Sequence, residues 1–335
     1  MKHLLIILFV MSIQTLFGQK SSLTDAYKIE VIENLTKLLS DYYIYPDVAE
    51  KTNKHIYKQY EAGSFDEYKD NESFAKALTE VVQNVSKDKH MRIMAHKSYK
   101  APKNTLERKA EQRMDQINNY RNYNHGFKEL KLLEGNVAYL DLRGFSPMDR
   151  AKEIADAYMK LLSQADAVII DLSKNGGGDP SMVQYLCSYF FNDIIHLNSL
   201  YYREGDRKEE YWTLKEVGGK KMNDVPLYVM ISEETFSGAE EFSYNMQTQK
   251  RATIIGQTSG GGANPGGTRG INENLAVFIP TGKAINPITN TSWEGVGVIP
   301  EIITKKEETF DKVLNLAQSA AESQRKSKLE IYILT

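Results

Sequence analysis

A serine stands at a point in the sequence where an apolar stretch gives way to a helical pattern. Residues 226–231 are strand-like, and Ser237 follows them in the heptapeptide TFSGAEE, which begins a predicted helix. Amide N–H groups of a first helical turn lack partners within the helix, so they and the helix dipole favour nearby negative charge. Ser237 is therefore a candidate nucleophile whose oxyanion would be stabilised. The S-x-x-E spacing of Ser237 and Glu240 is also typical of a capping box, which is purely structural.

A first glycine-rich segment could supply a second oxyanion donor. Residues 171–178 read DLSKNGGG and follow a predicted strand, and Pro180 can open the helix that comes next. Glycine amides can approach a substrate carbonyl closely because no side chain intervenes. A tight turn is the structural alternative. Neither a P-loop nor a G-x-G-x-x-G pattern is present, so the sequence supports a nucleotide site only weakly.

A second glycine-rich segment, residues 256–270, holds seven glycines in fifteen residues. Such a composition predicts an irregular loop, and we expect it to form a mobile wall of a substrate cleft. An exposed loop without function is the alternative.

Few residues could act as the base and the acid that a serine nucleophile needs. His90 lies in SKDKHMRI, just past a helical region, where a solvated turn histidine is the structural alternative. Glu294 lies between a tryptophan and a glycine, a setting that can partly bury a carboxylate or leave it in an exposed turn. No pair of histidines has metal-ligand spacing and Cys187 is the single cysteine, so we predict no metal, no cofactor and a buried thiol.

Composition limits the function classes. The chain has 335 residues, of which 41% are hydrophobic, as in an ordinary globular protein. Its 42 basic and 44 acidic side chains form no long run of one sign, so nothing indicates a nucleic-acid partner. Residues 1–18 are typical of a secretory signal peptide, too short and polar to span a bilayer comfortably. We expect an exported protein, periplasmic or extracellular, without a membrane span after signal removal. The oligomeric state stays open.

The order of periodic patterns predicts two folding units. Apolar residues at helical spacing in 25–85 indicate a small helical domain, and a charged segment follows it. Strand, helix and strand patterns at 137–142, 151–162 and 167–172 predict a parallel pair with a right-handed crossover, and the pattern repeats around Ser237. Further strands are expected at 252–255, 275–279 and 296–298, with a closing helix at 309–323. The predicted division is signal peptide 1–18, helical domain 19–95, connector 96–130, core 131–306, and C-terminal helix and tail 307–335.

Five motifs occur together in a recognisable order. They read GNVAYLDLRGF, IIDLSKNGGG, TFSGAEEFSYN, RATIIGQTSGGGANPGG and IPTGKAINPITNTSWEGVGVIPE. In this combination the sequence resembles the tail-specific, or C-terminal processing, serine peptidase family. It is most similar to the interphotoreceptor retinoid-binding-protein-like branch, which is related to tricorn core proteases. The resemblance implies an α/β fold, with a crotonase/ClpP-like ββα core behind an N-terminal helical domain.

The same resemblance implies roles for particular residues. Ser237 would be the nucleophile, with the amides of Gly238 and of either Gly176 or Gly177 as the oxyanion hole.

Members that use a Ser-Lys dyad carry a lysine in a glycine-rich loop after the serine. Here the corresponding segment, Gly260, Gly261 and Gly262, has none, so the base is expected to be a histidine. By position, the base and its orienting carboxylate fall on His90 and Glu294. The three glycines and Asn264 would line the substrate cleft.

Four positions depart from the family pattern. Ser173 replaces an arginine, Gln257 replaces a glutamate and Glu301 replaces an aspartate. Lys89 stands where tricorn-like enzymes place a relay serine before the histidine. The preferred function is an exported serine peptidase that cleaves polypeptides through an acyl-enzyme. The alternative is a binding protein for retinoid-like or fatty-acid-like ligands, which would not need Ser237, His90 and Glu294 together.

Overall fold

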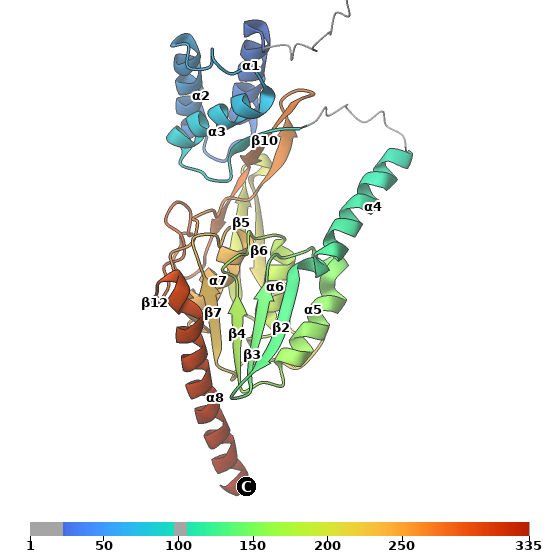
Figure 1. Ribbon diagram of the computed structural model, residues 1–335, viewed down its shortest axis with the longest axis vertical. Coiled ribbons are helices and arrows are strands. Elements are labelled where there is room, and N and C mark those ends of the chain that lie inside the picture. The colour runs from blue at the N-terminus through green and yellow to red at the C-terminus, as the bar shows by residue number, and fades with distance from the viewer. Residues whose placement is uncertain (1–22, 97–105, 335) are drawn as a thin grey trace, which may run out of the picture.

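The computed structural model describes residues 23–96 and 106–334 of the chain. The predicted signal peptide, residues 1–18, and part of the predicted connector, residues 97–105, lie outside these ranges. Figure 1 shows a group of three helices at one end, a central sheet with helices packed on it, and a long last helix. In the part of the chain that is described, no helix combines the length and the apolar character that crossing a bilayer requires.

The N-terminal helices pack around their own apolar cluster and end beside a short strand. They are α1 (Asp25–Tyr42), α2 (Pro46–Glu61) and α3 (Asn71–Ser86), followed by β1 (Arg92–Ala95). The Asp70 side chain caps α3 by accepting a hydrogen bond from the Ser73 amide at 2.9 Å. Lys87 ends α3 in the left-handed region, with φ of 58°, and so turns the chain toward His90. Local capping therefore fixes where the candidate base leaves the helices.

A strand of the core completes the apolar cluster of the helices. β10 (Leu275–Pro280) pairs on one side with β1 and on the other with β9 (Gly266–Gly270), both antiparallel. Its buried side chains pack with those of α1 to α3 in one cluster. Figure 1 shows β10 reaching toward the three helices. β10 thus joins the helical part to the core. The expectation of an irregular loop throughout 256–270 is wrong. Residues 266–270 form β9 because they pair with β10.

The main sheet has six strands in the order β12-β8-β7-β4-β3-β2. All neighbours are parallel except β2 and β3, and the predicted parallel pairing of β3 with β4 is confirmed. The strands are β2 (Phe127–Leu133), β3 (Val137–Leu142), β4 (Ala167–Asp171), β7 (Leu227–Ile231), β8 (Thr253–Gly256) and β12 (Ile302–Ile303). This arrangement bears out the predicted α/β class.

Helices cover both faces of this sheet. One apolar cluster includes side chains of α5 (Met148–Leu162), α6 (Pro180–Ser188) and α7 (Gly238–Thr248), and α8 (Thr309–Leu334) packs in a separate cluster with β3, β4, β7 and β8. A smaller sheet has the order β11-β5-β6. The remaining elements are α4 (Leu106–Asn122), β5 (His196–Tyr202), β6 (Arg207–Trp212), β11 (Gly282–Ile285) and the short helices η1 (Asn124–Gly126), η2 (Glu204–Asp206) and η3 (Lys306–Glu308).

Two sequence predictions differ from the structure in this region. Residues 296–298 form no strand, because Gly295 and Gly297 adopt positive φ values of 72° and 75° and the Gly297 amide donates to the Trp293 carbonyl at 2.9 Å. The closing helix runs on to Leu334 instead of ending at Ser323. Cys187 is fully buried in α6, as predicted.

The packing of β10 against the helices predicts the effect of one substitution. Leu275 is fully buried, so Leu275→Ala should lower the free energy of unfolding by about 2–5 kcal/mol in urea denaturation. Leu161, which is 59% exposed on α5, serves as the matched control, and Leu161→Ala should change it by less than about 0.5 kcal/mol. Equal effects of the two substitutions would contradict the proposed importance of this contact.

Candidate active site

The connection between β7 and α7 places Ser237 in an unusual backbone conformation. Its φ and ψ are 55° and −121°, outside the regions that non-glycine residues normally occupy. The Ser237 amide donates to Glu240 Oε2 at 2.8 Å as part of a capping box. Ser237 also lines a cavity of about 630 Å³. The capping box is therefore present, and a strained residue at a cavity wall is typical of functional sites. The role of Ser237 as a nucleophile stays a prediction.

Glu240 fixes the glycine-rich segment to the start of α7. This buried carboxylate accepts hydrogen bonds from the Ser259 hydroxyl at 2.5 Å and from the amides of Gly261 and Gly262 at 2.6 and 2.9 Å, besides that of Ser237. Burial raises the pKa of Glu240, although these four donors oppose the rise. The segment is thus held by specific hydrogen bonds, which corrects the expectation of a mobile wall.

The imidazole of His90 is packed between aromatic rings. Its centroid lies 4.6 Å from that of Phe236 and 5.7 Å from that of Phe278, and its side chain is only 12% exposed. A Cβ atom on Gly262 would come within 2.7 Å of His90 Cε1, so only glycine fits under the ring. His90 is therefore a buried, positioned histidine, and the solvated-turn alternative is wrong.

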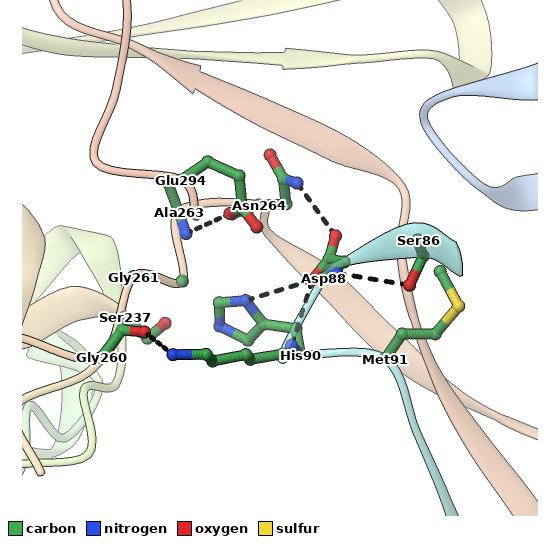
Figure 2. Close-up of polar contacts among 12 residues, drawn as sticks. Ser86, Asp88, His90, Met91, Ser237, Gly260, Gly261, Ala263, Asn264 and Glu294 are labelled. Atoms are coloured by element: carbon green, nitrogen blue, oxygen red, sulfur yellow. Dashed lines mark hydrogen bonds and ion pairs between the residues drawn. The ribbon is translucent and has the colours of Figure 1, made fainter. Parts of the chain in front are cut away.

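His90 and Ser237 face the same cavity although they are far apart in the sequence. The cavity is lined by both residues and by Gly262 and Asn264 of the glycine-rich segment. Figure 2 shows one ring nitrogen of His90 directed toward Asp88 and the other on the side of Ser237. The structure thus brings the predicted base to the predicted nucleophile. Gly260 and Gly261, which were also expected to line the cleft, are not among the described residues that line it; the Gly261 amide donates instead to Glu240 Oε1 at 2.6 Å.

Two carboxylates lie beside the imidazole, one of which sequence interpretation missed. One ligand atom each of Asp88, His90 and Glu294 lies within 4.8 Å of the other two. Glu294 Oε2 accepts from the amides of Ala263 and Asn264 at 2.6 and 3.1 Å, and Asp88 Oδ1 accepts from the His90 amide at 3.0 Å. The D-x-H spacing in SKDKH was the available signal for Asp88. His90 Nδ1 lies 3.9 Å from Asp88 Oδ1 and, within the described ranges, makes no hydrogen bond.

Burial sets the protonation of this group. Burial, together with the charge of Arg92, lowers the pKa of His90 to about 4. The imidazole is therefore neutral at pH 7 and can accept a proton. Burial raises the pKa of Glu294 to about 7, and the charge of Asp88 adds to the rise. Burial also raises the pKa of Asp88. Burial thus disfavours the charged form of both carboxyl groups.

The glycines of the first motif approach the nucleophile closely. A Cβ atom on Gly177 would lie 2.7 Å from the Gly238 nitrogen and 2.8 Å from Ser237 Cβ. The Gly177 amide donates to Asn175 Oδ1 at 2.8 Å, so it is already bonded and does not offer the free donor that was expected of it. Gly176 and Gly238 line the cavity.

Lys89 contacts the glycine-rich segment. Its ammonium donates to the Gly260 carbonyl at 2.6 Å and so ties the segment before His90 to the glycine-rich segment. The position that carries a relay serine in tricorn-like enzymes here has a structural contact instead.

The Asp88, His90 and Glu294 group could also offer oxygen and nitrogen ligands to a cation. Ligands around a tetrahedral zinc ion lie about 3.4 Å apart at bond lengths near 2.1 Å. The 3.9 Å separation of His90 Nδ1 and Asp88 Oδ1 is longer than this. The spacing therefore fits a proton-handling group better than a preformed zinc site.

The raised pKa of Glu294 predicts how stability depends on pH. A carboxyl whose pKa rises from 4.5 to about 7 on folding binds more protons when folded than when unfolded in that range. The free energy of unfolding therefore falls as pH increases between these values. Glu294→Gln keeps an acceptor for the two amides but cannot ionise, so the fall measured by urea denaturation from about pH 5 to about pH 8 should be smaller. Glu233→Gln, at an exposed site, should leave it unchanged. An unaltered slope in Glu294→Gln would refute this assignment.

Two parts of the sequence match known protein families. Residues 136–304, half of the chain, match peptidase family S41. Residues 25–125 match the N-terminal domain of S41 peptidases in eukaryotic IRBP.

Two relatives share the core. The chain is 25% identical over 178 residues to a carboxy-terminal-processing protease of Bartonella bacilliformis, a match that covers 52% of this chain and 40% of that protein. It is 27% identical over 197 residues to a tail-specific protease of Haemophilus influenzae, covering 53% of this chain and 26% of the relative. The chain thus matches less than half the length of each relative.

Solved structures of similar fold cover nearly the whole chain. A candidate peptidase of Parabacteroides merdae has a TM-score of 0.61 at 16% identity, over 86% of this chain and 96% of that one. A lipoprotein of Streptococcus agalactiae gives 0.54 at 16% identity, over 87% and 96%. The tricorn protease gives 0.53 at 12% identity, over 89% and 37%. At these identities the likeness concerns the fold. With the family match over half of the sequence, it confirms the resemblance that the motifs indicated, and the chain belongs to peptidase family S41.

Proposed function

We propose that the protein is an exported serine peptidase that hydrolyses polypeptides through an acyl-enzyme. One observation supports this most strongly, namely that Ser237 and a buried, neutral His90 line the same cavity. Membership of a peptidase family agrees with it. The export part of the proposal depends on the leader-like residues 1–18 alone.

In the proposed reaction His90 acts first as a base and then as an acid. Its Nε2 atom accepts the proton of the Ser237 hydroxyl while Oγ attacks the scissile carbonyl carbon. The amides of Gly238 and Gly176 donate to the oxyanion that forms. As the tetrahedral intermediate collapses, the C–N bond breaks and His90 gives its proton to the leaving amine. A water molecule, activated in the same way, then releases the acyl group from Ser237.

Glu294 is the proposed orienting carboxylate. Its Oε2 is held by two backbone amides, whereas Oε1 accepts no hydrogen bond from the residues that the structure describes. A hydrogen bond from His90 Nδ1 to this oxygen would select the productive tautomer and stabilise the imidazolium. Such contacts often tighten only when substrate binds. Both Asp88 oxygens already accept hydrogen bonds, which makes Asp88 the less available partner.

The proposed site joins two parts of the chain. His90 belongs to the proposed helical domain, residues 19–95, whereas Ser237 and Glu294 belong to the proposed core, residues 131–306. Pairing of β1 with β10 holds the two parts together. Correct docking of the helical part is therefore a condition for activity.

Covalent labelling tests the nucleophile and the base together. A fluorophosphonate probe should label the wild-type protein at Ser237, and labelling should be lost in Ser237→Ala and fall by about 100-fold or more in His90→Ala. His55→Ala, on α2, is the matched control and should label like the wild type. Mass spectrometry of the labelled peptide identifies the site.

Two results would contradict the proposal. Labelling that persists in Ser237→Ala would place the nucleophile elsewhere. A wild-type protein that stays unlabelled but binds retinol or a fatty acid tightly would favour the carrier function, since apolar side chains such as Phe236 and Phe278 line the same cavity.

The two carboxylates can be separated by their effects on catalysis. Glu294→Gln should lower kcat/KM for a cleavable peptide by about 100-fold or more, because the imidazole loses its orienting acceptor. Asp88→Asn should have a smaller effect, since the Asp88 oxygens are engaged by Tyr43, Asn264 and the His90 amide. A larger loss in Asp88→Asn than in Glu294→Gln would exchange the two assignments.

A further inference from the structure

A second buried carboxylate lies in the same cavity and has no part in the mechanism above. Glu241 follows Glu240 in α7, is 5% exposed, and lines the cavity together with Ser237. Its neighbour Glu240 points to backbone amides of the glycine-rich segment and is satisfied by them. Glu241 has no such set of donors, so a structural role of the same kind does not account for it.

Among the described residues, no cation is one of the groups that shift the pKa of Glu241, although Lys89 and Arg92 line the same cavity. Burial raises the pKa of Glu241 to about 7, the charge of Asp179 adds to the rise, and the amide of Asn198 opposes it. The titratable groups that interact with it electrostatically are Asp179 at the start of α6, Cys187 in α6, Tyr202 in β5 and Tyr211 in β6. None of these is a cation. A buried carboxylate without a partner is costly, and a cationic ligand group would relieve that cost.

Two asparagines near Glu241 make only weak polar contacts: the Asn198 amide lies near the Glu241 carboxylate, and that of Asn245 near the Cys187 thiol. Asn245 lies one turn further along the same face of α7, and Asn198 lies in β5; both are essentially inaccessible to solvent. Within residues 23–96 and 106–334, neither Nδ2 nor Oδ1 of either side chain makes a hydrogen bond of good geometry. Buried amides without partners are rare in folded proteins. The acid and the two amides together indicate that a polar group from outside the chain completes this region.

The cavity that holds Glu241 also offers apolar surface for an aliphatic stem. Pro180, Leu200, Tyr202 and Ala284 line the same cavity as Glu241, Ser237 and Gly238. A side chain in this cavity would therefore meet both apolar surface and a carboxylate. Lysine and arginine have this pattern, an apolar stem with a charged end.

We propose that Glu241 makes this pocket selective for lysine or arginine at the acyl residue, meaning the substrate residue whose carbonyl is attacked. The inference rests on the proposed peptidase function and specifies its substrate class. The ammonium or guanidinium group would form a desolvated, charge-assisted pair with the Glu241 carboxylate. The stem would pack on Leu200 and Ala284.

Peptides that differ only at the acyl residue test this selectivity. With lysine, arginine, glutamine or leucine before a fluorogenic leaving group, the wild type should show a kcat/KM at least about 30-fold higher for the two basic residues than for leucine. Glu241→Gln, which is nearly isosteric, should abolish this preference, so that the ratio of kcat/KM for lysine to that for leucine falls to within about threefold of one. Glu233 is an exposed carboxylate between β7 and α7, and Glu233→Gln is the matched control. This variant should keep the wild-type preference. The preference should also increase between about pH 6 and pH 8 as Glu241 ionises.

A binding measurement separates this inference from the proposed function. In Ser237→Ala, which cannot form the acyl-enzyme, uncleaved lysyl peptides should bind more tightly than leucyl peptides by a similar factor, and Glu241→Gln added to Ser237→Ala should remove the difference. Failure of fluorophosphonate labelling would refute the peptidase proposal without deciding this one. Equal affinity for lysyl and leucyl peptides, a preference for glutamine, or a basic preference that survives in Glu241→Gln would overturn the inference.

Discussion

The arrangement of the site depends on one buried carboxylate. Glu240 accepts hydrogen bonds from the Ser237 amide and from two amides of the glycine-rich segment, so a single side chain fixes the nucleophile turn and the surface on which the imidazole lies. Because these donors are buried, removing the acceptor would leave several of them unsatisfied at once. The strained backbone at Ser237 persists because this network over-determines it.

The second constraint is the packing of the helical part on β10. His90 reaches the cavity from the segment after α3, and the apolar cluster that positions this segment includes β10 residues of the core. The predicted base and the predicted nucleophile therefore adjoin separate apolar clusters. Lys89 adds a direct contact between the two through the Gly260 carbonyl.

Much of this organisation could be predicted from the periodicity of apolar residues and from the order of the motifs. Strands at 137–142 and 167–172 and the helix that follows Ser237 have long, consistent apolar patterns, so local preference and tertiary packing agree. The predictions for residues 266–270 and 296–298 were wrong for opposite reasons. The first gained strand structure from a partner that no local pattern reveals, and the second lost it to two glycines with positive φ. Asp88 was missed although the D-x-H spacing was an available signal, and Glu241 could not be identified because its importance lies in its burial, which only the fold determines.

The close approach of Gly262 to the imidazole makes this position suited to an inactivating substitution. A single methyl group at this position would lie 2.2 Å from Phe236 Cζ and 2.7 Å from His90 Cε1, so it would crowd both rings while every reacting group stays chemically intact. Gly262→Ala would thus offer a way to silence the proposed chemistry without altering the serine, the histidine or either acid. An otherwise native cleft of this kind is suited to capturing uncleaved ligands for structure determination.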